Sequence, residues 1–117
     1  MNERVENEQG SLAPEPASAA YRHFADFYPY YLSEHLNRTC RRIHFVGSSL
    51  GLVCLAMVIA TGNLWWVLAG FAIGYACAWV GHFFFEHNRP ATFKYPFFSF
   101  AGDWVMWKDI LTGKIKF

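Results

Sequence analysis

Histidines and carboxylates gather at two places in the sequence, and together they have the chemistry of a metal site. His35 lies nine residues before His44 and has Glu34 beside it, while Glu86 lies one helical turn after His82. Imidazole is a good ligand for iron, copper, zinc and nickel, and a carboxylate can hold the second ring nitrogen of a ligating histidine. Three or more converging imidazoles would therefore predict a bound metal, whereas a single histidine at a membrane surface is usually only an amphipathic side chain.

The segment between these two places is suited to lipid. From Ile43 to Phe85 there is no Asp, Glu, Lys or Arg, although a domain of 117 residues needs a charged surface to be soluble in water. A helix needs about 20 apolar residues to cross the bilayer core, and this run holds two such spans, at 43–60 and 64–85. We therefore expect an all-α membrane protein built on a two-span transmembrane helical hairpin.

Small residues predict which faces of the two spans pack together. Gly47 and Gly51 lie on the helical face of His44, and Gly74 lies on the face of His82. Membrane helices approach each other most closely through small residues, so both histidines should face the helix interface and neither should face lipid. Their distances from the hairpin tip differ by only about 3 Å at about 1.5 Å per residue, which places the two imidazoles at a similar depth.

The basic residues predict the orientation of the hairpin. All 10 Lys and Arg lie outside the two spans and their connecting turn. Because basic loops stay on the cytoplasmic side of a membrane, we expect both termini in the cytoplasm. The membrane would be the inner membrane of a bacterium or the endoplasmic reticulum of a eukaryote. The net charge is only +1 and no nucleic-acid-binding motif occurs, so we expect membrane lipid and no nucleic acid among the partners.

The flanking segments are predicted to lie outside the membrane core. Residues 1–20 are acidic and polar and are expected to form a disordered tail, which leaves 21–117 as a single membrane domain. The aromatic-rich segment 21–36 is typical of a membrane interface, and Pro29 is expected to interrupt any helix there. Apolar residues at helical spacing predict a flanking interfacial helix at about 100–113. The three cysteines are scattered and predict neither a disulfide nor a zinc site.

Three motifs of the sequence resemble a small family of membrane enzymes. They are S-E-H-x-N-x5-I-H-F-x-G at 33–47, W-x-G-H-x3-E-x2-R-P-A at 79–91 and G-D-x2-M-W at 102–107. The characterised fungal member of that family is an iron-dependent 2-hydroxy fatty acid dioxygenase of the α-oxidation of phytosphingosine. The resemblance covers about 21–117. It implies an enzyme that shortens a 2-hydroxy fatty acid by one carbon, with O2 as co-substrate and Fe(2+) as cofactor.

The resemblance also implies which residues form the site. Matched by position, the family's shared histidines fall on His35, His44 and His82, which would be the Fe(II) ligands. Glu86 and Arg89 match the second motif and would be catalytic residues that orient the ligands or the substrate. The acyl tail would stay in lipid while the polar head reaches the metal at the interface. Because one hairpin encloses little, a homo-oligomer is one way to surround the substrate.

Other polar residues are left outside the ligand set. His87 departs from the family pattern, and His23 matches no family position and is interpreted as a solvated histidine. Arg41 and Arg42 could bind a substrate carboxylate through paired hydrogen bonds, but contact with lipid phosphate is the favoured interpretation of both.

Two other interpretations stay open at this point. Two histidines on facing helices at equal depth could ligate haem from both sides, which leaves His35 without a role and predicts a strongly coloured protein. Alternatively, the chain could be a non-catalytic membrane assembly protein whose glycine faces serve association, which predicts no bound metal after purification. The metal content of the purified protein would separate these interpretations.

Overall fold

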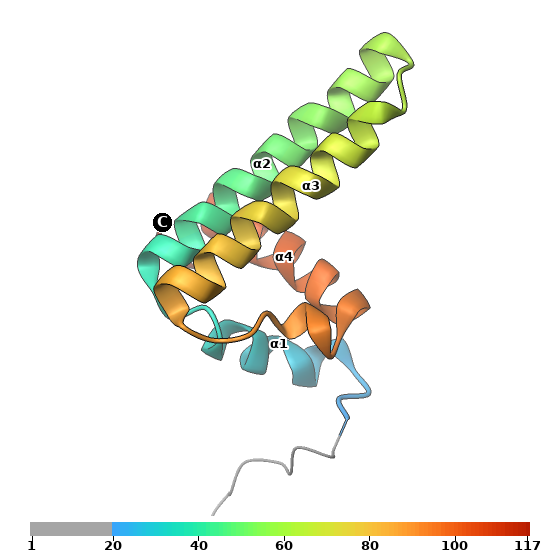
Figure 1. Cartoon of the computed structure of the whole chain (residues 1–117). Coiled ribbons are helices and arrows are strands. Elements are labelled where there is room, and N and C mark those ends of the chain that lie inside the picture. Colours follow the sequence, from blue (N-terminus) through green and yellow to red (C-terminus); the bar gives the residue numbers. More distant parts are fainter. Residues whose placement is uncertain (1–19) are drawn as a thin grey trace, which may run out of the picture.

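The computed structural model describes residues 20–117, and its regular elements are all helical (Figure 1). They follow in the order α1 (Phe24–Ser33), α2 (Arg38–Thr61), α3 (Trp65–Val80), the π-helical turn η1 (Gly81–Glu86), the 3-10 turn η2 (Ala91–Phe93) and α4 (Pro96–Leu111). No strand occurs in this part of the chain, so the predicted all-α fold is confirmed. The predicted tail lies outside the described residues, apart from its last residue.

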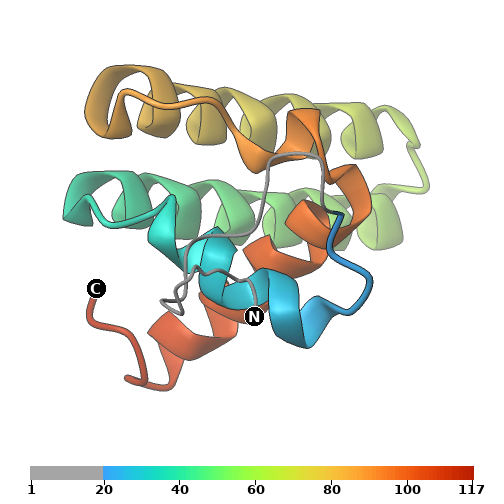
Figure 2. The same ribbon diagram turned by 90° about the horizontal axis from the view of Figure 1, so that it is seen from below.

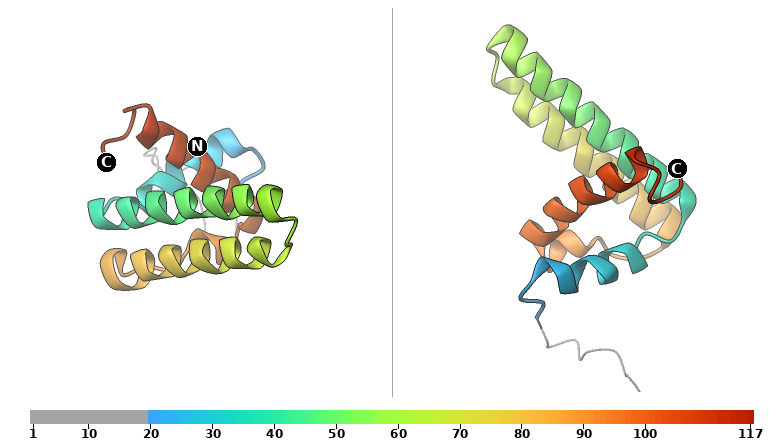
Figure 3. Two further views of the ribbon diagram at one scale, coloured as in Figure 1. Left: turned by 90° about the horizontal axis from the view of Figure 1, so that it is seen from above. Right: turned by 180° about the vertical axis from the view of Figure 1, so that it is seen from behind.

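Helices α2 and α3 form a long antiparallel hairpin that extends from the rest of the molecule (Figures 1 and 3). Asn37 caps α2, because its side-chain oxygen accepts a hydrogen bond of 3.1 Å from the backbone N–H of Cys40. α2 ends where Gly62 takes a left-handed conformation with φ of 70°. Glycine adopts that conformation without steric cost, so the chain can turn there directly into α3.

The two helices of the hairpin approach each other closely at glycine residues. A Cβ atom on Gly47 would lie 2.8 Å from the Cβ of Cys77, and a Cβ on Gly81 would lie 2.8 Å from the Sγ of Cys40. Distances this short exclude a larger side chain, so both positions need glycine for the helices to meet. Gly47 confirms part of the predicted packing face, which buries His44. The close contact at Gly81 was not predicted, and Cβ atoms on Gly51 and Gly74 would meet no heavy atom within 4 Å.

Both hairpin helices are long and apolar enough to cross a membrane. The two candidate spans are Arg38–Thr61 and Trp65–Glu86, the second of which includes η1. In the most apolar stretch of the first span only 17% is buried inside the protein, and in that of the second span only 11%. A core helix of a water-soluble protein would be mostly buried, whereas exposed apolar side chains suit lipid. The predicted spans at 43–60 and 64–85 fall within these helices, apart from Leu64.

Helices α1 and α4 pack against each other at the base of the hairpin, on the side of α2 (Figure 2). Their contact buries a small core around Phe27, Tyr31, Met106 and Ile110. Large apolar side chains each contribute about 1.5–3 kcal/mol when they are fully buried. This core therefore fixes α1 and α4 beside the end of the hairpin at which the chain enters and leaves it.

Pro29 does not interrupt the first helix, so that expectation from the sequence was wrong. Helix α1 continues through it from Phe24 to Ser33. A proline removes one backbone hydrogen bond and crowds the preceding turn. However, Phe27 and Tyr31 lie on either side of it along the chain and are buried in the core. Their burial outweighs the single lost hydrogen bond.

Helix α4 begins at Pro96, earlier than the helix predicted at about 100–113. Proline is favoured in the first turn of a helix, because its φ angle is preset and its missing N–H has no partner there in any case. The helix ends at Leu111, and Gly113 follows with φ of 83°. The proline was therefore the start signal that the sequence interpretation overlooked.

Candidate metal centre

Three histidines from three separate segments meet at the base of the hairpin. His35 lies in the connection between α1 and α2, His44 lies in α2 and His82 lies in η1. Potential ligand atoms of the three side chains all lie within 4.8 Å of one another. The ring centroid of His35 lies 4.5 Å from each of the other two, which are 5.1 Å apart. The structure therefore brings together the three histidines that the sequence interpretation placed in one site.

The cluster is closed to solvent. His35, His44 and His82 are 1%, 6% and 2% exposed, respectively. The Nε2 atoms of His35 and His44 are buried and have no hydrogen-bond partner among residues 20–117. A buried polar atom without a partner costs about 1–3 kcal/mol, and the lone pair of an imidazole nitrogen is a good metal ligand. The donor set therefore fits a cation that imidazole binds well, such as iron, copper or zinc.

His35 is held in one tautomer by the backbone of α1. Its Nδ1 lies 2.6 Å from the carbonyl oxygen of Tyr31, and a carbonyl can only accept, so Nδ1 carries the proton and Nε2 carries the lone pair. The Tyr31 ring also stacks on the imidazole, with centroids 4.1 Å apart. Burial, together with the smaller effects of His82 and Arg41, lowers the pKa of His35 to about 3, although the hydrogen bond to the Tyr31 carbonyl opposes that shift. His35 is therefore neutral at pH 7, as a metal ligand must be.

His82 is held in the same tautomer by Asn88. The Nδ1 of His82 lies 2.7 Å from the Oδ1 of Asn88. The amide nitrogen of Asn88 donates to the backbone carbonyl and the carboxylate of Glu34, at 3.1 and 3.3 Å, which turns the amide oxygen toward the histidine. The chain can reverse here because His87 takes a left-handed conformation with φ of 60°. The backbone N–H of Asn88 then donates to the carbonyl of His82 at 3.0 Å.

His44 faces the carboxylate of Asp103 on α4. The Nδ1 of His44 lies 3.8 Å from the Oδ1 of Asp103, which is too long for a hydrogen bond but close enough for the carboxylate to interact electrostatically with a cation held by His44. The hydroxyl of Tyr31 donates to the same oxygen. Burial raises the pKa of Asp103 to about 7, although the hydrogen bond from Tyr31 opposes that shift. A cation bound by His44 would favour the ionised carboxylate.

Gly102 allows α4 to bring Asp103 this close. A Cβ atom on Gly102 would lie 2.9 Å from the ring of Tyr31. Since Tyr31 is only 1% exposed, its ring has little room to move aside. The absence of a side chain at Gly102 therefore sets the distance between α4 and α1, and with it the position of Asp103.

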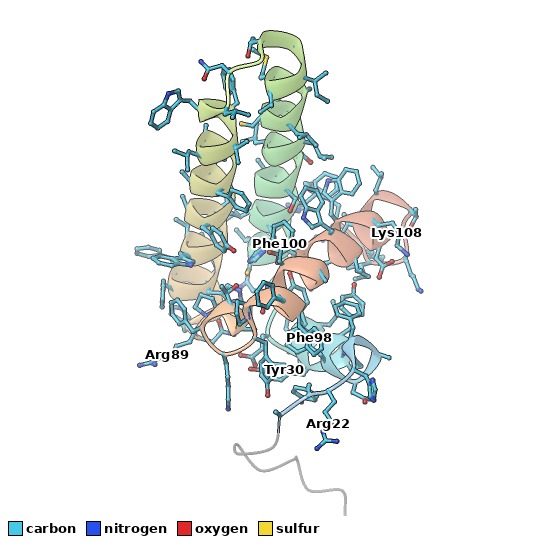
Figure 4. The ribbon with its side chains drawn as sticks, turned by 90° about the vertical axis from the view of Figure 1, so that its right-hand side faces the viewer. Arg22, Tyr30, Arg89, Phe98, Phe100 and Lys108 are labelled. Atoms are coloured by element: carbon cyan, nitrogen blue, oxygen red, sulfur yellow. The ribbon has the colours of Figure 1, made fainter. Side chains whose placement is uncertain are left out.

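Glu86 and Arg89 lie at the edge of the centre. The carboxylate of Glu86 accepts a hydrogen bond of 2.6 Å from the backbone N–H of Asn37, at the start of α2, where the helix dipole favours negative charge. Glu86 thus ties η1 to α2, one turn beyond His82. Arg89 is exposed, and its side chain points away from the rest of the molecule (Figure 4). The catalytic roles of Glu86 and Arg89 stay predictions.

The remaining polar residues from the sequence analysis are placed outside the cluster. Arg41 supports it indirectly, because its guanidinium donates to the backbone carbonyl of His35 at 3.2 Å. Arg42 donates to a backbone carbonyl near the C-terminus at 2.9 Å. His23 and His87 are exposed and do not join the three buried histidines. The conformation of His87 gives it a structural part in the turn that presents Asn88.

The chain as a whole matches one known family. The model of the family described as 2-hydroxy-palmitic acid dioxygenase Mpo1-like matches residues 21–115. The chain belongs to this Mpo1-like family. The match extends over all four helices and includes His35, His44 and His82, so the resemblance stated from the motifs is confirmed. No curated protein and no solved structure shows significant similarity to the chain.

The geometry of this Mpo1-like centre is unsuited to haem. Axial ligation would place a flat macrocycle between two opposed histidines. The ring of His35 instead lies 4.5 Å from those of both His44 and His82, at interplanar angles of 84° and 75°. Three imidazoles this close together leave no gap for a macrocycle, whereas they can surround a single ion.

Three residues of the Mpo1-like centre escaped the sequence interpretation. Tyr31, Asn88 and Asp103 each place an oxygen at or near the Nδ1 atom of one histidine. Asp103 is a specified position of the third motif, so the sequence contained a signal for it, whereas Asn88 falls on an unspecified position of the second motif. Tyr31 fixes the tautomer of His35 through its backbone carbonyl, which every residue possesses, so no side-chain pattern could have identified this contact.

Proposed function

We propose that this Mpo1-like protein is a membrane-bound, Fe(II)-dependent dioxygenase that shortens 2-hydroxy fatty acids by one carbon. The observation that carries the proposal is the buried cluster of three imidazoles, in which the Nε2 atoms of His35 and His44 are unpartnered in the described structure. The reaction balances with one molecule of O2, because a 2-hydroxy acid and O2 together give the shorter acid, CO2 and water. The bond between C1 and C2 breaks, and C2 becomes the new carboxyl carbon.

The residues of the chain would hold the metal and fix its ligands. The carbonyl of Tyr31 and the side-chain oxygen of Asn88 accept hydrogen bonds from the Nδ1 atoms of His35 and His82, respectively. The carboxylate of Asp103 faces His44. Such partners orient the rings and make them better ligands. Three protein nitrogens leave coordination positions open, and Fe(II) would supply the redox chemistry there for a substrate that chelates through its hydroxyl and carboxylate.

Glu86 and Arg89 have separate parts in this proposal. Glu86 holds η1 against the first turn of α2, and it thereby keeps His82 and His44 at a fixed separation. Arg89 follows η1 on an exposed loop, from which a planar guanidinium can bind a carboxylate through two parallel hydrogen bonds. We assign to Arg89 the attraction of the incoming substrate and the binding of the carboxylate oxygen that does not bind the metal, for which its exposed side chain would turn back toward the histidines.

The proposed location is a membrane with both termini on the cytoplasmic side. The histidines lie at the end of the hairpin that carries Arg38, Arg41 and Arg42, whereas the turn at the tip has no basic residue. A 2-hydroxy acid in the cytoplasmic leaflet would then present its polar head at the depth of the cluster. A homo-oligomer stays a prediction.

The direct test is the reaction itself. The full chain is purified in detergent, loaded with Fe(II) and given 2-hydroxypalmitic acid and O2, and the products are identified by mass spectrometry. The expected products are pentadecanoic acid and CO2, and palmitic acid should react far more slowly because it lacks the second chelating oxygen. His44→Ala should abolish turnover, whereas His87→Asn should preserve it. Equal inertness of both acids, with iron shown to be bound, would contradict the proposed substrate class.

A further inference from the structure

A groove runs along the hairpin from the metal centre toward the tip. It has a volume of about 230 Å³ and lies between α2, α3 and α4. His44 and Asp103 line it at the end near the metal centre, and Val58 and Trp66 line it near the tip. The rise along α2 from His44 to Val58 is about 21 Å at about 1.5 Å per residue. The groove is therefore long and narrow.

The lining of the groove changes from polar to apolar along its length. At the metal centre it includes the imidazole of His44, whose Nε2 is buried without a partner in the described structure, and the carboxylate of Asp103. Farther along, the lining is mainly apolar. Phe100 of α4 lies against the hairpin there, with its ring centroid 6.1 Å from that of Phe71 (Figure 4). A ligand that matches both parts has one polar end and an apolar tail.

Four glycines of the hairpin form two pairs that differ in how closely the facing helix approaches them. Gly47 and Gly81 are contact residues, since a Cβ atom on either would lie 2.8 Å from an atom of the facing helix. Gly51 and Gly74 line the groove, and a Cβ atom on either would have no heavy atom within 4 Å. The second pair is therefore not required for helix packing. Its effect is to leave open space beside the two helices.

We propose that this groove binds the acyl tail of the substrate, with the 2-hydroxy acid end at the three histidines, and that the absence of a side chain at Gly51 lets the tail pass toward the tip of the hairpin. The inference rests on the proposed function, and it replaces the expectation that the tail stays in bulk lipid. The occupant is a single acyl chain, because His44 and Asp103 line the groove at one end and its lining is mainly apolar beyond them.

A matched pair of substitutions tests the groove. Gly51→Leu places a branched side chain in the groove about 10 Å from His44 at about 1.5 Å per residue. Leucine is a better helix former than glycine, and there is space for it, so the variant should fold. Val53→Leu is the control, because Val53 lies on the same helix, is 56% exposed and does not line the groove.

The first readout is the dependence of activity on chain length. Gly51→Leu should lower kcat/KM for 2-hydroxypalmitic acid by at least about 10-fold, which is the penalty expected when a pocket is too short for its ligand. The value for 2-hydroxyoctanoic acid should stay at the wild-type level. Val53→Leu should leave both values unchanged. If Gly51→Leu keeps the wild-type profile while the wild type is active, the groove is not the tail site, although the proposed function stands.

The second readout does not depend on activity. A 2-hydroxypalmitic acid with a photoreactive diazirine on its terminal carbon is irradiated with the protein in phosphatidylcholine vesicles, and labelled residues are located by mass spectrometry. Labelling should occur at Val58 and Trp66, should be competed by unlabelled 2-hydroxypalmitic acid and should be lost in Gly51→Leu. Uncompeted labelling spread over lipid-facing side chains would overturn the proposal. If competed labelling persists while every 2-hydroxy acid is inert, the groove stands and the proposed reaction falls.

Discussion

The Nδ1 atom of His82 and the Oδ1 atom of Asn88 lie 2.7 Å apart, and this contact joins three segments of the chain. Asn88 also binds Glu34 at the end of α1 through its amide nitrogen, at 3.1 and 3.3 Å. It thereby fixes the orientation of the imidazole relative to the segment that carries His35. The exposed turn at His87 makes this arrangement accessible to mutation without disturbing the hairpin.

Asn88→Ala should weaken metal binding about 10–100-fold, which is the usual effect of removing the group behind a ligating histidine. The imidazole of His82 would keep its position on η1 but would lose the acceptor that selects its tautomer. The measurement is a competition titration with a chelator. His87→Asn is the matched control, because asparagine tolerates the left-handed conformation found there. Equal affinities for wild type and Asn88→Ala would refute the role.

Alanine at any one of His35, His44 or His82 should remove most of the bound metal while the chain still inserts into membranes. Each imidazole supplies one of only three protein nitrogens that converge, and two nitrogens hold an ion much less firmly than three. Elemental analysis of the purified variants measures the effect. His23→Ala should retain full metal content, since His23 is exposed and outside the cluster. Wild-type metal content in all three cluster variants would show that the site is elsewhere.

Gly102→Ala should destabilise the protein by about 1–3 kcal/mol, because inserting a methyl group into a packed region forces side chains or backbone to shift. Its Cβ would lie 2.9 Å from the ring of Tyr31. Gly51→Ala is the comparison, since its Cβ meets no heavy atom within 4 Å and alanine favours a helix. Thermal unfolding in detergent should separate the two. A variant at Gly102 as stable as the one at Gly51 would contradict the close approach of α4 to α1.

In a cysteine-free background expressed in the inner membrane of a bacterium, cysteine placed at Asn63 should react with a membrane-impermeant thiol reagent added from outside intact cells. Cysteine at Lys114 should react only after the cells are opened. Asn63 lies in the turn at the tip of the hairpin, whereas Lys114 follows α4 at the base of the hairpin. The expectation follows from the basic residues at the base, which favour the cytoplasmic side. Labelling of Lys114→Cys in intact cells would reverse the proposed orientation.

Tyr28→Phe should cost stability at neutral pH, and the cost should shrink in acid. Burial by itself raises the pKa of the Asp109 carboxyl, but the hydrogen bond of 2.8 Å from the Tyr28 hydroxyl and the charge of Lys108 hold the pKa below its ordinary value of 3.8. A carboxyl with a lowered pKa stabilises the fold above pH 3.8, and this contribution is lost as the pH falls through the lowered value.

Thermal unfolding of wild type and Tyr28→Phe at pH 7 and at a pH below the lowered pKa of Asp109 measures this difference. Tyr30→Phe is the control, because the Asp109 contact belongs to Tyr28 and not to Tyr30. A difference between wild type and Tyr28→Phe that stays the same at both pH values would show that the hydroxyl does not act through the ionised carboxylate.

Local patterns in the sequence were sufficient for the two helices of the hairpin and for the burial of His44, but not for the continuity of α1 through Pro29 or for the start of α4. The charge-free run predicted two long helices, and the spacing of Gly47 from His44 predicted that His44 is buried at their contact. These properties follow from the helical period, which is set by neighbouring residues along the chain. The place of His35 in the cluster came instead from the motif resemblance, because no helical period extends through the connection in which it lies.

The sequence by itself therefore determined the all-α hairpin, the burial of His44 and the family, whereas only the tertiary structure decided what surrounds the three imidazoles. Asp103 reaches His44 because α4 folds back across α2, a relation between distant segments that no local pattern encodes. Gly47 and Gly51 look equivalent as one G-x-x-x-G pair, yet Gly47 is closed by Cys77 and Gly51 opens into the groove. The difference arises from the way the two helices cross, which is set by packing along their whole contact.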